Sequence, residues 1–297
     1  TEILRRWAQA RGARLVSPPP YEAILSGDDR WLADLGEPGG PWVLPELERC
    51  FLRHAAGLSL VRKVLERAAS GHLAAGLIGC DSWAWAYLQR VFPAPQLPTL
   101  TVQGFDGRRL ADLFARLARA GGGRRVVYRN ARTGATVLPE PEALASGELE
   151  VSRELRQLAA HCRGNPAVAW RYWRQRLRAE PESDQTGSAD GQGPGGPEAR
   201  GEDTLWLSDA LEAPVLPAER GDDLVLILHA LLLHNGLPAA LLPELLPLPA
   251  GQIASLLARI EALGIVEADG ERRRVSTLGY AAAREMLRER SFLVDPF

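Results

Sequence analysis

Two short apolar runs in the first hundred residues each lead to side chains that could do chemistry. The runs cover residues 42–44 and 74–79. The polar residues that follow them are Glu46 and Glu48 after the first run, and Asp81 and Ser82 after the second. If both runs are parallel strands of one sheet, their carboxyl ends meet at one edge, where ligands bind in open α/β sheets. We therefore expect chemistry at this edge; the alternative is that the two glutamates are solvated acids.

The segments around these runs favour a parallel sheet. Between the runs, apolar residues repeat at helical spacing, at Leu58, Val61, Val64 and Leu65. Upstream, the pattern predicts a helix over 1–11, a strand over 13–16 and a helix over 21–35. Alternating helices and strands are typical of βαβ units and a parallel sheet. Residues 99–102 are expected to form one more strand.

Composition limits the classes of function. The chain has 297 residues, of which 46% are hydrophobic, and a formal net charge of −2. This length suggests about two domains, and the charge excludes a global basic field that would attract nucleic acid. The cysteines have no metal-type spacing and are expected to be reduced thiols of a cytoplasmic protein: Cys50, Cys80 and Cys162. No run is long and apolar enough to span a bilayer, so we expect no membrane span.

The order of elements resembles the nucleotide-binding core of AAA+ and related P-loop ATPases. In that family a strand ends in two acids that serve Mg²⁺ and the attacking water, and the next strand ends in a polar residue that senses the γ-phosphate. The resemblance implies that Glu46 is the catalytic glutamate and that Asp81 or Ser82 is the sensor. Pro45 stands where the family has its Mg²⁺-binding aspartate, and proline cannot bind a metal.

The first residues extend the resemblance. Thr1 begins a segment that looks like the helix after the Gly-Lys of a phosphate-binding loop, so Thr1 would bind the Mg²⁺ of ATP. The motif GxxxxGK[ST] itself does not occur in this chain. ATP and Mg²⁺ are therefore expected only if such a loop lies upstream, and the chain is expected to be N-terminally incomplete. Further on, residues 158–169 resemble the helices of an AAA+ lid, where Arg171 is a weak substitute for the sensor arginine.

The C-terminal part resembles a winged helix-turn-helix. Three predicted helices, over 224–234, 238–246 and 252–263, precede a hairpin around Asp269-Gly270. Polar groups that could contact DNA are Gln252, Ser255 and Arg259 on the third helix, and Arg272, Arg273 and Arg274 on the wing. Acids in the same region would repel a phosphate backbone. The alternative is a winged helix that contacts protein.

The predicted fold is therefore an α/β, parallel-sheet, P-loop NTPase-like core with a helical lid and a C-terminal winged helix domain. The core covers residues 1–106, the lid with a hairpin insertion 107–180, a disordered linker 181–203 and the winged helix domain 204–297. The function implied is an ATP-binding ATPase or nucleotide-gated switch, with a protein partner or self-association expected. The alternatives are a non-enzymatic adaptor and a winged-helix DNA-binding regulator.

Overall fold

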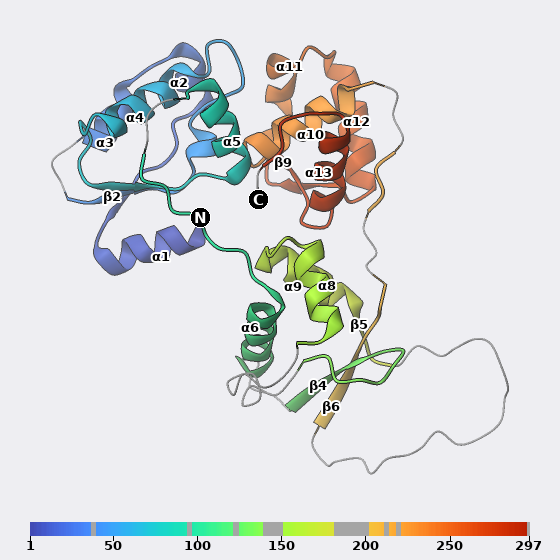
Figure 1. Ribbon diagram of the computed structural model, residues 1–297. Coiled ribbons are helices and arrows are strands. Elements are labelled where there is room, and N and C mark those ends of the chain that lie inside the picture. The colour runs from blue at the N-terminus through green and yellow to red at the C-terminus, as the bar shows by residue number, and fades with distance from the viewer. Residues whose placement is uncertain are drawn as a thin grey trace, which may run out of the picture. The chain divides into compact units, whose positions relative to one another are not determined.

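The described residues form two compact units of mixed α and β structure (Figure 1). The computed structural model describes residues 1–36, 40–93, 97–120, 125–138, 151–180, 202–210, 214–217 and 221–295. Unit 1 comprises Thr1–Leu100 and Pro214–Phe297, and unit 2 comprises Thr101–Ala213. No helix within these described ranges is long and apolar enough to cross a bilayer.

Unit 1 begins with a parallel sheet, as the sequence predicts. Strands β1 (Arg14–Leu15), β2 (Trp42–Leu44) and β3 (Gly76–Ile78) lie in the order β1-β2-β3. Leu15 is in register with Val43, and Val43 with Leu77, and both pairings are parallel. The central strand β2 is buried along its whole length, as expected for the middle of a parallel sheet.

Helices cover this sheet. They are α1 (Glu2–Arg11), α2 (Tyr21–Ser26), η1 (Arg30–Leu32), α3 (Ala33–Gly36), η2 (Leu47–Arg49), α4 (Ser59–Ala69) and α5 (Ser82–Val91). Helix α1 ends at Gly12, whose φ of 62° is a left-handed conformation that glycine adopts without strain. Helix α4 buries Leu60, Val61, Val64 and Leu65, which form one face at helical spacing. The predicted helix between the two strands is confirmed.

The C-terminal elements of unit 1 pack against the first hundred residues. They are α10 (Asp223–Leu233), β7 (Leu237–Pro238), η3 (Ala239–Leu241), α11 (Leu242–Leu245), α12 (Ala250–Ala262), β8 (Val266–Asp269), β9 (Arg272–Val275) and α13 (Tyr280–Glu289). The strands form an antiparallel sheet in the order β7-β9-β8. Helix α10 is apolar on all sides, as is typical of a helix enclosed by other elements. Its residues share one core with Ile24, Leu60 and Trp83.

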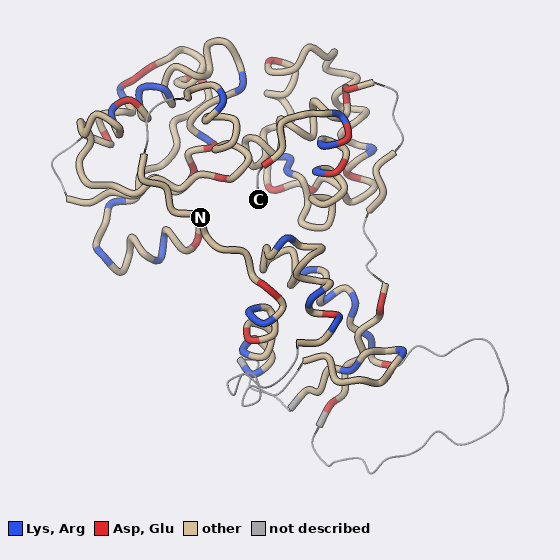
Figure 2. The backbone as a smooth tube through the Cα atoms, viewed as in Figure 1, with Lys and Arg blue, Asp and Glu red and all other residues tan. Residues whose placement is uncertain are grey.

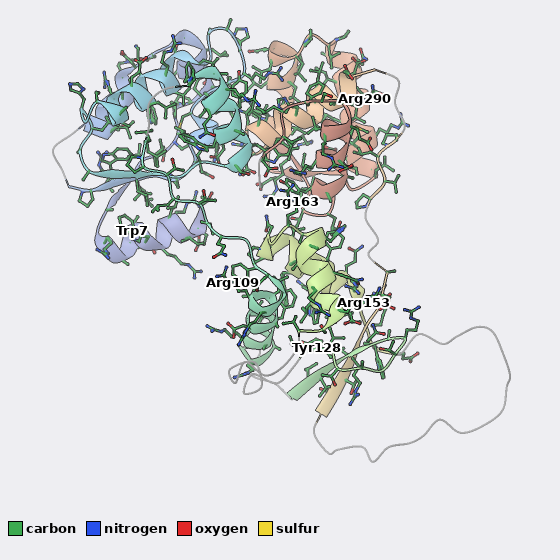
Figure 3. The ribbon with its side chains drawn as sticks, in the orientation of Figure 1. Trp7, Arg109, Tyr128, Arg153, Arg163 and Arg290 are labelled. Atoms are coloured by element: carbon green, nitrogen blue, oxygen red, sulfur yellow. The ribbon has the colours of Figure 1, made fainter. Side chains whose placement is uncertain are left out.

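Unit 2 is a small layered structure of helices and a sheet. Its elements are α6 (Gly107–Ala120), β4 (Arg125–Asn130), α8 (Arg153–His161), α9 (Pro166–Arg176), β5 (Leu177–Arg178) and β6 (Glu202–Leu207). The sheet has the order β4-β6-β5, with β4 parallel and β5 antiparallel to β6. Aromatic rings fill the space between sheet and helices: the ring centroid of Trp173 lies 5.4 Å from Tyr128, labelled in Figure 3, and 4.8 Å from Phe114.

The structure differs from the sequence predictions at two places. Residues 99–102 form no strand; Leu100 and Val102 are 93% and 80% exposed, and no strand in the described part of the chain pairs with them. Strand β6 begins at Glu202, so the predicted boundary at 204 falls inside a strand that pairs with β4 and β5. Residues 181–201 of the predicted linker lie outside the described residues. After β4 the chain turns back, with an antiparallel bridge between Arg129 and Thr136 where the sequence predicts a hairpin.

Candidate site at the ends of strands β2 and β3

The carboxyl ends of β2 and β3 are joined by backbone hydrogen bonds. The N–H of Gly79 donates to the Leu44 carbonyl at 2.7 Å, and the N–H of Leu47 donates to the Gly79 carbonyl at 2.8 Å. The N–H of Asp81 donates to Oε2 of Glu48 at 3.1 Å. The two groups of polar residues that the sequence places at strand ends therefore meet at one edge of the sheet.

Glu48 is the buried acid of this edge. The residue is only 2% exposed to solvent. Burial, followed by the charges of Asp81 and Glu46, raises the pKa of Glu48 to about 7. The carboxyl group is thus poised to gain or lose a proton near neutral pH, and Glu48 is not the solvated acid that the alternative interpretation expects.

Glu46 is held by two arginines. Its Oε2 lies 3.2 Å from Nη1 of Arg49 and 3.6 Å from Nη2 of Arg5. Arg5 comes from α1 and Arg49 from η2, so the ion pairs connect the first helix to the end of β2. The predicted catalytic glutamate lies at the sheet edge, with its charge balanced by cations of the same unit.

Asp81 is the N-cap residue of α5. Its Oδ1 accepts the N–H of Trp83 at 3.0 Å, which is the usual role of an N-cap aspartate. Burial raises the pKa of Asp81, while the Trp83 N–H and the amino-terminal charge of Thr1 lower it. Helix α1, which Thr1 precedes, reaches this edge of the sheet, because its Arg5 lies 3.6 Å from Glu46.

Ser82 is bound to the C-terminal segment of unit 1. Its Oγ donates to Oδ2 of Asp295 at 3.0 Å. The same carboxylate accepts the hydroxyl of Tyr280 at 3.2 Å and Nε of Arg284 at 2.9 Å. The hydroxyl at the predicted sensor position is therefore bound by Asp295, 213 positions away.

Two histidines, His229 in α10 and His234 at its C-cap, both contact Arg53, and the sequence does not predict these contacts. His234 is 1% exposed; its Nδ1–H donates to the Glu48 carbonyl at 3.2 Å, and its Nε2 accepts the N–H of Arg53 at 3.3 Å. His229 accepts Nη1 of Arg53 on its Nδ1 at 2.8 Å. Burial lowers the pKa of both histidines to about 4, so they are neutral at pH 7. The available signal was two histidines within an otherwise apolar helix.

The arginines predicted to contact DNA are engaged within unit 1. Arg272 donates from Nη2 to the carbonyls of His234 and Asn235, at 3.2 and 3.1 Å, and also to that of Gly236. Arg273 is paired with Glu261. Arg274 lies 2.9 Å from Glu267 and 3.9 Å from Asp269. Figure 2 shows acidic and basic residues interspersed on these elements.

The remaining predicted residues lie away from the strand ends or in the other unit. Gln252 donates to Asp223 at the start of α10. Ser255 and Arg259 are exposed on α12. Arg171, the substitute sensor, is exposed on α9 in unit 2.

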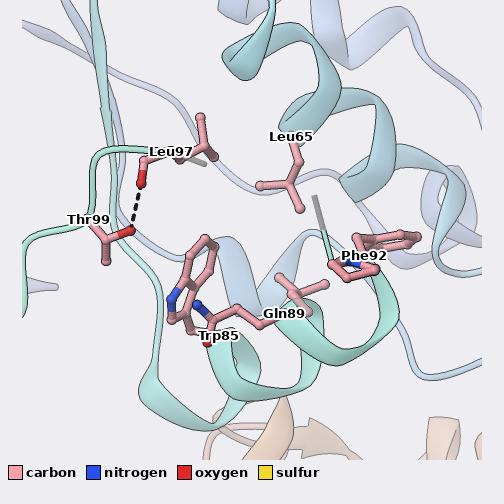
Figure 4. Close-up of a pocket in the computed structure, with 8 residues that line it drawn as sticks. Leu65, Trp85, Gln89, Phe92, Leu97 and Thr99 are labelled. Atoms are coloured by element: carbon pink, nitrogen blue, oxygen red, sulfur yellow. Dashed lines mark hydrogen bonds between the residues drawn. The ribbon is translucent and has the colours of Figure 1, made fainter. Parts of the chain in front are cut away.

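A cavity of about 410 Å³ lies in unit 1 beside α4 and α5 (Figure 4). Its lining is mostly apolar and consists of Leu65, Trp85, Leu88, Gln89, Phe92, Pro93, Leu97 and Thr99. None of the strand-end acids takes part in it. The cavity could hold an apolar group but offers no catalytic side chain.

Neither a metal-ligand group nor a reactive thiol is found at the strand ends in the described part of the chain. Within the described residues, no group of three or more His, Cys, Asp or Glu side chains could hold a metal ion. Burial raises the pKa of the free thiols Cys50 and Cys80 far above the usual value, which disfavours the nucleophilic thiolate. No protein-family model, no curated protein and no solved structure matches this chain. The function is therefore argued from the geometry of the strand ends.

Proposed function

We propose that unit 1 contains an AAA+-like, P-loop ATPase-like core whose nucleotide site lies at the carboxyl ends of β2 and β3. The observation that carries this proposal is the meeting of the two strand-end groups, joined by the Asp81 N–H and Oε2 of Glu48 at 3.1 Å. Strand ends of a parallel sheet are where α/β proteins bind nucleotides. Helix α1 supports the proposal, because its Arg5 lies 3.6 Å from Glu46 at the end of β2.

In the described part of the chain, the outer edge of β3 is free to pair with a further strand. Within the described residues β3 pairs only with β2, and Gly76 at its start is exposed. An unpaired strand edge offers N–H and C=O groups to a further strand. In the proposed protein, an upstream strand pairs with β3 and leads through the phosphate-binding loop into α1.

The proposed roles follow from position. Thr1 would hold Mg²⁺ bound to the phosphates, Glu46 would orient the attacking water, and Asp81 or Ser82 would contact the γ-phosphate. Pro45 offers no ligand to Mg²⁺, so we expect slow hydrolysis. A nucleotide-gated switch fits this site better than a fast enzyme does.

The C-terminal elements support a winged helix. Their order of helix, strand, short helix, long helix and hairpin, with strands in the order β7-β9-β8, is the order we would expect of a winged helix-turn-helix. We propose that it contacts protein rather than DNA, because the wing arginines Arg273 and Arg274 are paired with acids. A DNA-binding wing needs such groups free for phosphates.

Calorimetry with MgATP tests the nucleotide proposal. The proteins compared are this chain and a chain extended upstream of Thr1. We expect the extended chain to bind, and Thr1→Ala to weaken binding at least about tenfold through loss of a Mg²⁺ ligand. Thr101→Ala, which changes an exposed residue at the start of unit 2, is the matched control and is expected to bind as the parent does.

A second candidate function is a non-enzymatic adaptor. The observation in its favour is that Glu46, Asp81 and Ser82 all have partners within the chain. Absence of MgATP binding by both chains would overturn the nucleotide proposal and leave the adaptor.

A further inference from the structure

The sheet of unit 2 carries a row of two arginines and a tryptophan on the face that points away from the helices. Tyr128 of β4 points toward the helices, because its ring centroid lies 5.4 Å from that of Trp173 in α9. Side chains alternate along a strand, so Arg129 points to the opposite face. Trp206 of β6 is in register with Arg129, and Arg178 of β5 is in register with Trp206. Because residues in register share a face, these three side chains form one row with the tryptophan in the centre.

The buried residues of the same strands agree with this assignment. Asn130, two positions after Tyr128, donates from its side chain to Oε1 of Glu154 in α8 at 2.8 Å. Leu207, which is in register with Asn130, is fully buried. The helices therefore cover the face of Tyr128 and Asn130, and the outer row lies on the other face.

The outer row is accessible to a ligand. Arg178 is exposed, and Arg129 and Trp206 are half-buried. Both arginines donate to backbone carbonyls, and neither is paired with an acid in the described part of the chain. The indole N–H of Trp206 has no hydrogen-bond partner among the same residues. The next residues on this face, Val127 and Thr204, are uncharged, so the row presents positive charge around an aromatic ring.

We propose that this outer row, Arg129, Trp206 and Arg178, binds single-stranded nucleic acid. An accessible tryptophan on a sheet offers a ring on which an unpaired base stacks. Guanidinium groups bind phosphate oxygens through charge-assisted hydrogen bonds. Adjacent strands lie about 4.8 Å apart, so the two arginines stand about 10 Å apart on either side of the ring, where they can reach phosphates that flank the stacked base. The inference concerns unit 2 and does not depend on the nucleotide site proposed in unit 1.

Fluorescence anisotropy of a short, labelled oligothymidylate measures binding to the full chain. Trp206→Leu keeps an apolar side chain but removes the stacking ring. Arg178→Gln changes an exposed residue, so it reports even if the first variant folds poorly. Arg174→Gln is the matched control, because it removes an exposed cation from α9 in the helical layer of the same unit. Circular dichroism checks that each variant is folded.

We expect the parent to bind and Trp206→Leu to bind at least about fivefold more weakly, as the loss of one stacked base predicts. Arg178→Gln should bind more weakly and show a smaller dependence of affinity on salt, because one phosphate contact is lost. Arg174→Gln is expected to bind as the parent does. No measurable binding by the parent, unchanged binding by folded Trp206→Leu, or equal weakening in Arg178→Gln and Arg174→Gln would overturn the inference.

Two competitors identify the class of ligand. Polyglutamate of matched charge tests whether the row only attracts negative charge, and duplex DNA tests whether unpaired bases are required. We expect the labelled single strand to be displaced by unlabelled single strand at a lower concentration than by either competitor. Equal displacement by polyglutamate or by the duplex would reject the stacking of a base on Trp206, and with it the inference.

Discussion

Replacing Glu48 with glutamine should change how the stability of unit 1 depends on pH. Burial, followed by the charges of Asp81 and Glu46, raises the Glu48 pKa from 4.5 to about 7. Between these two values the folded state binds more protons than the unfolded state. The free energy of unfolding due to this group therefore falls as pH rises from 4.5 to 7 and is constant above.

The structure sets the size of the effect. The pKa of Glu48 rises from 4.5 to about 7 on folding, and each pKa unit corresponds to about 1.4 kcal/mol. Ionised Glu48 therefore lowers the free energy of unfolding by on the order of 3 kcal/mol above pH 7. Glutamine resembles the protonated acid and keeps an oxygen that can accept the Asp81 N–H. Glu48→Gln should therefore match the parent below pH 4.5 and exceed its free energy of unfolding by on the order of 3 kcal/mol near pH 8.

Urea unfolding at several pH values measures this difference. The indole N–H signals of Trp42 and Trp83 report on unit 1 alone, because they bond to the Ala74 carbonyl and the Tyr280 hydroxyl within it. Comparing variant and parent at each pH cancels the titration of all other groups.

A matched control removes an exposed carboxylate. Glu66 of α4 has a side chain 67% exposed, and Glu66→Gln should stay within about 0.5 kcal/mol of the parent at every pH. A Glu48→Gln difference that does not vary with pH, or a variant less stable than the parent at pH 8, would refute the reasoning.

Three further predictions concern other parts of the chain. Burial lowers the pKa of His229 and His234 from 6.5 to about 4, so the unfolded state binds more protons than the folded state between these two pH values. The contribution of the two neutral histidines to the free energy of unfolding should therefore decline as pH falls from 6.5 to 4. Acid unfolding followed by circular dichroism should be steeper in the parent than in a His234→Gln variant. Arg272→Ala should lower the free energy of unfolding by about 1–3 kcal/mol through the loss of three backbone contacts, and Arg274→Ala by less than about 1 kcal/mol; equal effects in thermal melts would contradict this. In unit 2, Asn130→Ala should cost about 2–3 kcal/mol in urea unfolding, because the buried amide bonds two carboxylates and two backbone N–H groups; a loss below about 0.5 kcal/mol would count against that network.

Local pattern was sufficient to predict the parallel sheet. Residues 42–44 and 76–78 are short apolar runs separated by an amphipathic helix, and such a unit has few alternatives to a parallel pairing. The same parallel pairing predicts that Glu46 and Asp81 lie at one edge of the sheet. It failed at residues 99–102, because β-forming side chains make a strand only where another strand offers its backbone groups.

The surroundings of the site could not be predicted, because they depend on contacts between distant segments. The buried Glu48 accepts a hydrogen bond on its backbone carbonyl from His234, the C-cap residue of α10, which lies 186 positions away. The ion pairs of the β9 arginines depend on hairpin register, which sets Arg274 opposite Glu267. The sequence contains both the acids and the arginines, but it does not determine which of them pair.

Hydrogen exchange of the extended chain, with and without MgATP, tests the central claim most directly. The proposed nucleotide site predicts slower exchange of the backbone N–H groups in residues 44–50 and 79–83, where the strand ends meet. Residues 125–138 of unit 2 serve as an internal reference that nucleotide should leave unchanged. Unchanged exchange at the strand ends under conditions where ATP is bound would contradict the claim and place the nucleotide elsewhere.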